Sequence, residues 1–178
     1  MQKRVVKRVL AAAGILACLG LAYTGVIILR NEIGIIPVEG AGRSSWNPGS
    51  YWAYPWGKSI THKGIDIFAK KGTAVKASHG GIVVSTGIGR VSGKYAVLLD
   101  ENLRYYYYAH LNSIAVKQFQ FISQGQKIGS VGDTGNARGK PPHLHFVVIS
   151  TIPHFWLADK SVQGRRKMFF LDPGSLIH

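Results

Sequence analysis

The sequence predicts an all-β domain of antiparallel sheets, preceded by one N-terminal transmembrane helix. Beyond residue 64, short runs of strand-forming residues alternate with glycines, and no amphipathic helical pattern interrupts them. Near the start, a stretch of uncharged residues is long enough to cross a bilayer. The chain has 178 residues and 46% apolar content, which suffices for one domain with a substantial core and excludes a disordered polymer.

The uncharged stretch covers residues 9–29, "VLAAAGILACLGLAYTGVIIL". At roughly 1.5 Å per residue it spans about 31 Å as a helix, close to the thickness of the bilayer hydrocarbon. A cleaved signal peptide has a shorter apolar region, and lipidation at Cys18 would leave eleven hydrophobic residues beyond the modified cysteine. We therefore expect a single-pass anchor in the cytoplasmic (inner) membrane, with residues 31–178 extracytoplasmic or periplasmic. Four basic residues before the span favour this orientation: Lys3, Arg4, Lys7 and Arg8.

Charge and cysteine content limit the partners of the exported part. Cys18 is the only cysteine and lies within the predicted span, so no internal disulfide stabilises the domain. Residues 31–178 contain 17 Lys and Arg against 8 acids, a formal charge of +9. This charge suits either a soluble surface beside anionic lipid or attraction to an anionic polymer outside the membrane. Nucleic acid is not expected as a partner, because the domain is exported and its basic residues are scattered.

The exported part divides into a linker and a domain. Residues 31–50 mix Gly, Pro and Ser with little periodicity, which predicts a linker. The domain follows as residues 51–178. Its first segment, "YWAYPWGKSITHKG", holds aromatic residues that either cover an edge of the core or form the wall of a groove.

Seven segments of this domain read as strands, and the 22 glycines of the chain suit tight turns between them. In chain order they are "GIDIF", "AVKA", "GIVVST", "KYAVLLD", "LRYYYYAHL", "KIGSVG" and "HLHFVVIS". In "LRYYYYAHL", strict alternation predicts that Tyr106, Tyr108 and His110 share one face, with Tyr107, Ala109 and Leu111 on the other.

The last strand begins with two histidines, His143 and His145. Side chains alternate along a strand, so both imidazoles point to the same side. Such a pair is either a packing feature or half of a metal site, because neutral imidazole is the commonest metal ligand. The alternation alone does not choose between these two roles.

A catalytic zinc site usually has three protein ligands, and "THKGIDIF" supplies candidates in His62 and Asp66. In a straight strand these two residues would stand about 13 Å apart, too far for one ion. The chain must therefore bend between them, and Gly64 can supply the bend.

Taken together, these motifs resemble the M23 zinc metallopeptidases, also called LytM or lysostaphin-type endopeptidases. The resemblance covers about residues 57–147, with its landmarks in order: "HKGID", "GTAVKASHGGIV", "YAHL", "IGSVGDTG" and "PHLHF". It implies that His62, Asp66 and His145 bind one Zn²⁺, and that His143 and His110 are catalytic residues that bind no metal. It also implies a groove on an antiparallel sheet, walled by loops. The remaining histidines, His79, His154 and His178, are assigned surface or packing roles.

The same resemblance implies a zinc-dependent endopeptidase that hydrolyses peptide bonds of bacterial peptidoglycan with a metal-activated water. The glutamate base of the HExxH peptidases is absent, since no Glu follows Glu101. Two alternatives stay open: a non-catalytic module that binds the cell wall or activates other wall hydrolases, and a peptidase acting on secreted proteins. Whether a protein activator is needed is also left open.

Overall fold

The computed structural model describes residues 12–16, 18–19 and 33–178, and the chain divides into two units, 1–32 and 33–178. In the first unit, residues 12–16 and 18–19 are helical. The rest of the predicted span 9–29 lies outside the described residues. Within the residues that are described, no helix is both long and apolar enough to cross a membrane. The transmembrane anchor stays a prediction.

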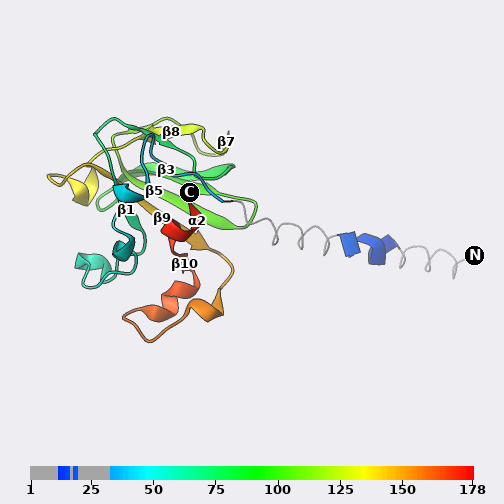
Figure 1. Cartoon of the computed structure of the whole chain (residues 1–178). Coiled ribbons are helices and arrows are strands. Elements are labelled where there is room, and N and C mark those ends of the chain that lie inside the picture. The colour runs from blue at the N-terminus through cyan, green and yellow to red at the C-terminus, as the bar shows by residue number, and fades with distance from the viewer. Residues whose placement is uncertain (1–11, 17, 20–32) are drawn as a thin grey trace, which may run out of the picture. The chain divides into compact units, whose positions relative to one another are not determined.

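The second unit is built on two antiparallel sheets (Figure 1). The larger sheet has the strand order β1-β9-β5-β4-β3-β7, and β10 also pairs with β9. The smaller sheet has the order β2-β8-β6. The strands are β1 Ile65–Phe68, β2 Ala74–Lys76, β3 Gly81–Gly89, β4 Gly93–Leu99, β5 Arg104–Leu111, β6 Ser113–Ile114, β7 Phe121–Ile122, β8 Lys127–Ser130, β9 His143–Ser150 and β10 Phe170–Leu171.

The all-β, antiparallel fold class is confirmed, and each of the seven predicted strands is present. Three further strands, β6, β7 and β10, were not predicted, because they have two residues each and are too short to show an alternating pattern. Helices of this unit are short: η1 Arg43–Ser45, η2 Pro48–Ser50, η3 Gly57–Ser59, η4 Gly135–Ala137, η5 Phe155–Leu157, η6 Gly164–Met168 and α2 Pro173–Leu176.

The predicted linker is corrected for its described residues, 33–50, which belong to the compact second unit. Val38 is 2% exposed and forms a β-bridge with Val75, and Trp46 is also part of the hydrophobic core. Gly34 forms a bridge with Ile177 near the end of the chain. The Gly- and Pro-rich composition therefore reflects an irregular path over the sheets, whose apolar side chains are buried.

The register around β9 decides which side chains face the core. His145 of β9 has a directly opposed residue on each neighbouring strand: Asp66 on β1 and Ala109 on β5. Directly opposed residues of antiparallel strands point to the same face, so these positions share a face with His143. The alternate residues of β9, Leu144 and Phe146, are fully buried in the core. The prediction that His143 and His145 share one side of the strand is confirmed.

Candidate metal centre

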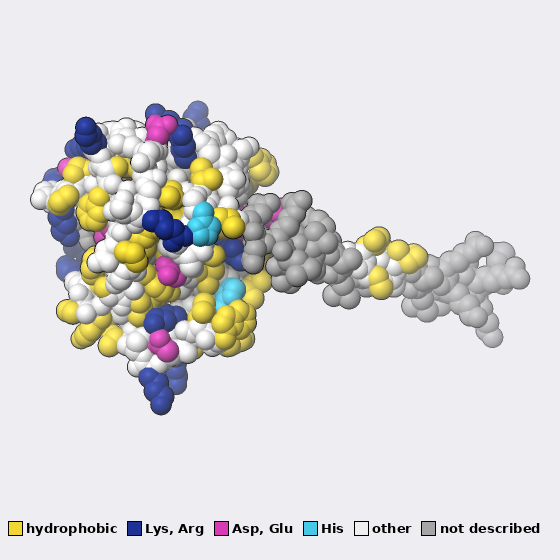
Figure 2. Space-filling view, in the orientation of Figure 1, with side chains coloured by type: hydrophobic (Ala, Val, Ile, Leu, Met, Phe, Trp, Pro, Cys, Tyr) yellow, Lys and Arg dark blue, Asp and Glu magenta, His cyan; other side chains and the backbone are white. Residues whose placement is uncertain are grey.

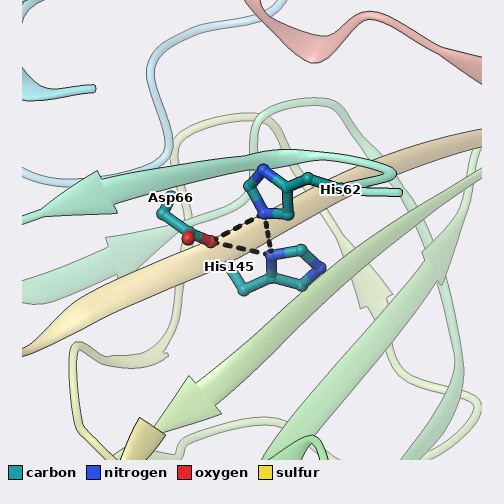
Figure 3. Close-up of side chains that lie close together, drawn as sticks. All are labelled: His62, Asp66 and His145. Carbon is teal, nitrogen blue, oxygen red and sulfur yellow. Dashed lines mark hydrogen bonds and ion pairs between the residues drawn. The ribbon is translucent and has the colours of Figure 1, made fainter. Parts of the chain in front are cut away.

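His62 and Asp66, which are close in sequence, and His145, which is distant from both, bring their donor atoms together beside β9 (Figure 3). His62 Nε2 lies 3.1 Å from Asp66 Oδ1 and 3.1 Å from His145 Nδ1. His145 Nδ1 lies 2.8 Å from Asp66 Oδ1. Asp66 and His145 come from paired strands, whereas His62 reaches them from the loop before β1. The three ligands expected from the resemblance are thus close enough to share one ion.

The hydrogen bonds around His62 show why these atoms suit a metal ion. His62 Nδ1 lies 2.9 Å from the carbonyl oxygen of Ser50, which can only accept, so Nδ1 carries the hydrogen. If the ring is neutral, Nε2 then presents a lone pair to the Asp66 carboxylate. His145 Nδ1 can donate one hydrogen, either to His62 Nε2 or to Asp66 Oδ1. Electron-rich atoms at this distance repel each other unless a proton or a metal cation lies between them. The donor set therefore fits a bound cation.

The spacing and chemistry of the set fit zinc in particular. Zinc ligands lie about 2 Å from the ion, so neighbouring ligands of a tetrahedral site lie about 3.3 Å apart. The observed spacings of 2.8 to 3.1 Å come close to this value. Two imidazoles with one carboxylate form a ligand set that zinc commonly takes in catalytic sites, where a fourth position is left for water.

The protonation of Asp66 also suits metal binding. Burial by itself raises the pKa of this carboxyl, but the adjacent imidazoles of His145 and His62 outweigh it and hold the pKa well below its usual range. For His145, burial lowers the pKa, and the neighbouring Asp66 only partly offsets this effect. The carboxylate is thus ionised and the His145 imidazole neutral near pH 7, the forms in which both residues bind metals.

The two remaining predicted residues, His143 and His110, lie beside these three. The His143 ring is 5.1 Å from the His110 ring, edge to face, and His110 is 5.8 Å from His145. His143 Nδ1 donates to the carbonyl of Pro141 at 2.8 Å, and His110 Nδ1 donates to the carbonyl of Thr134 at 2.9 Å. Both rings therefore keep Nε2 as the basic nitrogen. Burial lowers the pKa of His110 to about 4, so this ring is neutral near pH 7.

His110 reaches the site through a break in strand alternation that the sequence analysis did not predict. Tyr106 and Tyr108 face the core. Leu111 also faces the core, although strict alternation would place it on the opposite face of β5. His110 has a φ of 63°, and the pairing of β5 with β4 shifts register at this point. This bulge turns His110 toward His143 and His145 instead of into the core. The prediction that His110 shares a face with Tyr106 and Tyr108 is wrong.

The groups that orient His62 were not predicted from the sequence. Ser50, from the predicted linker, supplies the carbonyl that fixes its tautomer. The ring of Trp56 stacks on His62 at 4.1 Å between centroids, with 21° between the planes. Trp56 remains partly exposed, so it both packs on the site and forms part of its wall. Of the aromatic residues in "YWAYPWGKSITHKG", Trp56 thus packs directly on a residue of the predicted metal site.

Gly64 allows β1 to approach β9 closely. A Cβ atom at this position would lie 2.3 Å from the carbonyl oxygen of Phe146 and 2.9 Å from Val147 Cγ2. The first of these is a backbone atom, which cannot move without displacing β9. Glycine is therefore required here because of the close backbone approach, beyond the bend inferred from the sequence.

We expect Gly64→Ala to lower the free energy of unfolding by about 1–3 kcal/mol, because the added methyl group overpacks the contact between β1 and β9. Chemical denaturation of the variant measures this change. Gly42→Ala is the matched control, since a Cβ there meets nothing within 4 Å. Equal midpoints for the two variants would contradict the assigned role of Gly64.

The other histidines lie apart from this cluster. His79 is buried and stacks on Tyr106 at 4.5 Å. His154 packs edge-on against Trp156, and the exposed His178 contacts Arg43. Their assignment to surface or packing roles agrees with these contacts. In the part of the chain that the structure describes, the group that could hold a metal is His62, Asp66 and His145.

Known proteins share this domain. The chain is 40% identical over 111 residues to the L-Ala–D-Glu endopeptidase of Bacillus subtilis, covering 58% of this chain and 33% of the relative. It is 38% identical over 114 residues to the peptidoglycan DD-endopeptidase ShyA of Vibrio cholerae, covering 64% of this chain and 26% of the relative. It thus spans a third or less of the length of these two curated relatives.

A solved structure, that of a zinc-containing peptidase from Vibrio cholerae, superimposes with a TM-score of 0.55 at 30% identity, covering 66% of this chain and 36% of that one. The sequence model of Peptidase family M23 matches residues 60–154, which include all five predicted site residues. Because this match covers more than half of the sequence, the chain belongs to Peptidase family M23.

Proposed function

We propose that this chain is a zinc-dependent endopeptidase that hydrolyses peptide bonds of bacterial peptidoglycan. The observation that carries the proposal is the convergence of His62 Nε2, Asp66 Oδ1 and His145 Nδ1 within 3.1 Å of one another. One relative is named as a peptidoglycan endopeptidase and another as an endopeptidase for an L-Ala–D-Glu bond, and both names support the substrate class. A module that had lost its catalytic function would have no need to keep this donor set, so the geometry favours the enzyme over a non-catalytic wall-binding or activator module.

His62, Asp66 and His145 would hold the zinc, because one donor atom of each lies within 3.1 Å of the other two. When bound in such a site, zinc supplies Lewis acidity, which polarises a substrate carbonyl and lowers the pKa of a water molecule. His143 and His110 have their Nδ1 hydrogens committed to backbone carbonyls, so each Nε2 can accept a proton from the attacking water. Once protonated, the same nitrogen can donate to the oxyanion or to the leaving amine.

The proposal is tested with the full chain, purified in detergent and loaded with zinc, on intact peptidoglycan. We expect soluble fragments whose masses show a hydrolysed peptide bond, and none from protein treated with a chelator. The two curated relatives are named for different peptide bonds, so the masses also identify which bond is cut. Intact peptidoglycan after incubation, together with cleavage of an unrelated secreted protein, would contradict the proposed substrate.

We further propose that residues 9–29 anchor the chain in the cytoplasmic membrane, with the domain on its outer side. The basis is the uncharged stretch of the sequence and the basic residues before it. The expected result is that the protein sediments with the membrane and keeps its original N-terminus. Fractionation and N-terminal sequencing check this, and a soluble mature protein that begins near residue 25 would contradict the anchor.

A further inference from the structure

Residues 151–169, here called the C-terminal lobe, form an excursion between β9 and β10 that carries η5 and η6. In Figure 1 this is the orange segment that extends below the sheets. The family match ends at residue 154, so most of the lobe lies beyond the matched part of the chain. None of the site residues described above lies in it.

The first half of the lobe exposes a run of large apolar side chains. Trp156 is 77% exposed and Phe155 69%, and the nearby Ile152 is about half exposed. The ring of His154 packs against Trp156 at 5.0 Å, nearly perpendicular to it. Aromatic side chains exposed side by side need an apolar partner to be shielded from water. In Figure 2, hydrophobic and basic side chains lie next to each other in the region where Figure 1 places this segment.

The second half of the lobe is basic. The lobe contains four Lys and Arg against one acid, a net charge of +3. Lys167 pairs with that acid, Asp159, at 2.6 Å. Among the described residues, Lys160, Arg165 and Arg166 are exposed and form no ion pair with a carboxylate. Three uncompensated cations therefore lie on the same lobe as the exposed aromatic residues.

The lobe is held against the rest of the domain. Trp52 Nε1 donates to the carbonyl of Val162 at 3.0 Å, and Thr61 Oγ1 bonds to Gln163 at 3.0 Å. Within the lobe, the backbone N–H of His154 donates to the carbonyl of Met168 at 2.8 Å. The first two bonds fasten the lobe to the rest of the domain, and the third holds its aromatic and basic halves beside each other.

We propose that the C-terminal lobe docks on the surface of a bilayer that contains anionic phospholipid. Phe155 and Trp156 enter the region between headgroups and acyl chains, while Arg165 and Arg166 contact the phosphates. An acidic polymer would neutralise the cations but leave the aromatic rings in water. A second copy of this chain would bring two lobes of like charge together. An anionic lipid surface both shields the aromatic side chains from water and pairs the cations with phosphates.

The test uses residues 33–178, because every residue of the described core lies within this unit and the predicted anchor does not. Cosedimentation with vesicles of phosphatidylethanolamine and phosphatidylglycerol should show binding that is lost on pure phosphatidylcholine. Arg165→Gln with Arg166→Gln should weaken binding about 30-fold, since each cation near an anionic surface contributes about a fivefold factor. Phe155→Ala with Trp156→Ala should weaken it by about tenfold or more.

Matched controls separate the lobe from general charge and apolar exposure. Arg90→Gln with Lys117→Gln removes the same charge from other exposed positions, and Phe121→Ala removes a side chain that is 81% exposed on β7. These controls should bind vesicles like the parent protein, and thermal melting shows that all variants are folded. Equal losses in control and lobe variants, binding to peptidoglycan but not to vesicles through the same residues, or self-association that depends on Trp156 would each overturn the proposal.

Discussion

His145→Ala and His62→Ala are expected to remove most of the zinc from the purified chain and, with it, the peptidoglycan-hydrolysing activity. Each substitution takes away one of three converging donor atoms. Loss of an outer partner of a metal ligand already costs about 10–100-fold in metal affinity, and loss of a ligand itself should cost more. Elemental analysis after desalting measures zinc per chain, and fragment release from peptidoglycan measures activity.

His178→Ala is the matched control for this experiment, because His178 is exposed at the end of the chain. It should keep about one zinc per chain and full activity. His62 is almost fully buried, so its replacement also risks the fold, whereas His145 is more open. Melting curves of the metal-free proteins separate the two effects. Zinc contents that match the control in both folded variants would refute the ligand assignment.

The sequence was sufficient to predict the seven longer strands and the side of β9 on which its histidines lie. In "HLHFVVIS", the apolar residues at alternate positions require a core face, which leaves His143 and His145 together on the other face. The local sequence pattern does not predict that β1 pairs with β9, the pairing that places Asp66 opposite His145. That contact depends on the long-range register of strands almost eighty residues apart, for which only the family resemblance supplied a prediction.

Two features of the site follow from backbone geometry that has no local sequence signal. The positive φ of His110 moves its side chain to the opposite face of β5, against the simple alternation. The carbonyl groups of Ser50, Pro141 and Thr134 fix the tautomers of three histidines. Every residue has a carbonyl group, so residue type cannot reveal these contacts. The linker prediction was wrong at Ser50 because it rested on amino-acid composition, which does not show how a segment packs.

The second large effect is expected where a histidine serves the reaction without holding the metal. His143→Ala should keep about one zinc per chain and lose activity by about 10²–10⁴-fold, the usual contribution of a positioned acid or base. His143 Nε2 lies 4.0 Å from Asp66 Oδ1, outside the 2.8 to 3.1 Å spacing of the three proposed ligands. His110→Ala should behave in the same way, because its Nε2 is likewise left basic by the bond from Nδ1 to Thr134.

Comparison with His145→Ala distinguishes a metal ligand from a catalytic residue that does not bind the metal. If His143→Ala loses zinc while His145→Ala retains it, the two roles on β9 are reversed. Full activity in a zinc-loaded His143→Ala protein would show that this residue is not catalytic. His143→Gln divides the effect further, because an amide can donate a hydrogen bond to an oxyanion but cannot take a proton from water. If His143 acts mainly as a base, the glutamine and alanine variants should be equally slow. If it acts mainly by stabilising charge, His143→Gln should recover a large part of the loss, since one oxyanion donor is itself worth about 10²–10³-fold.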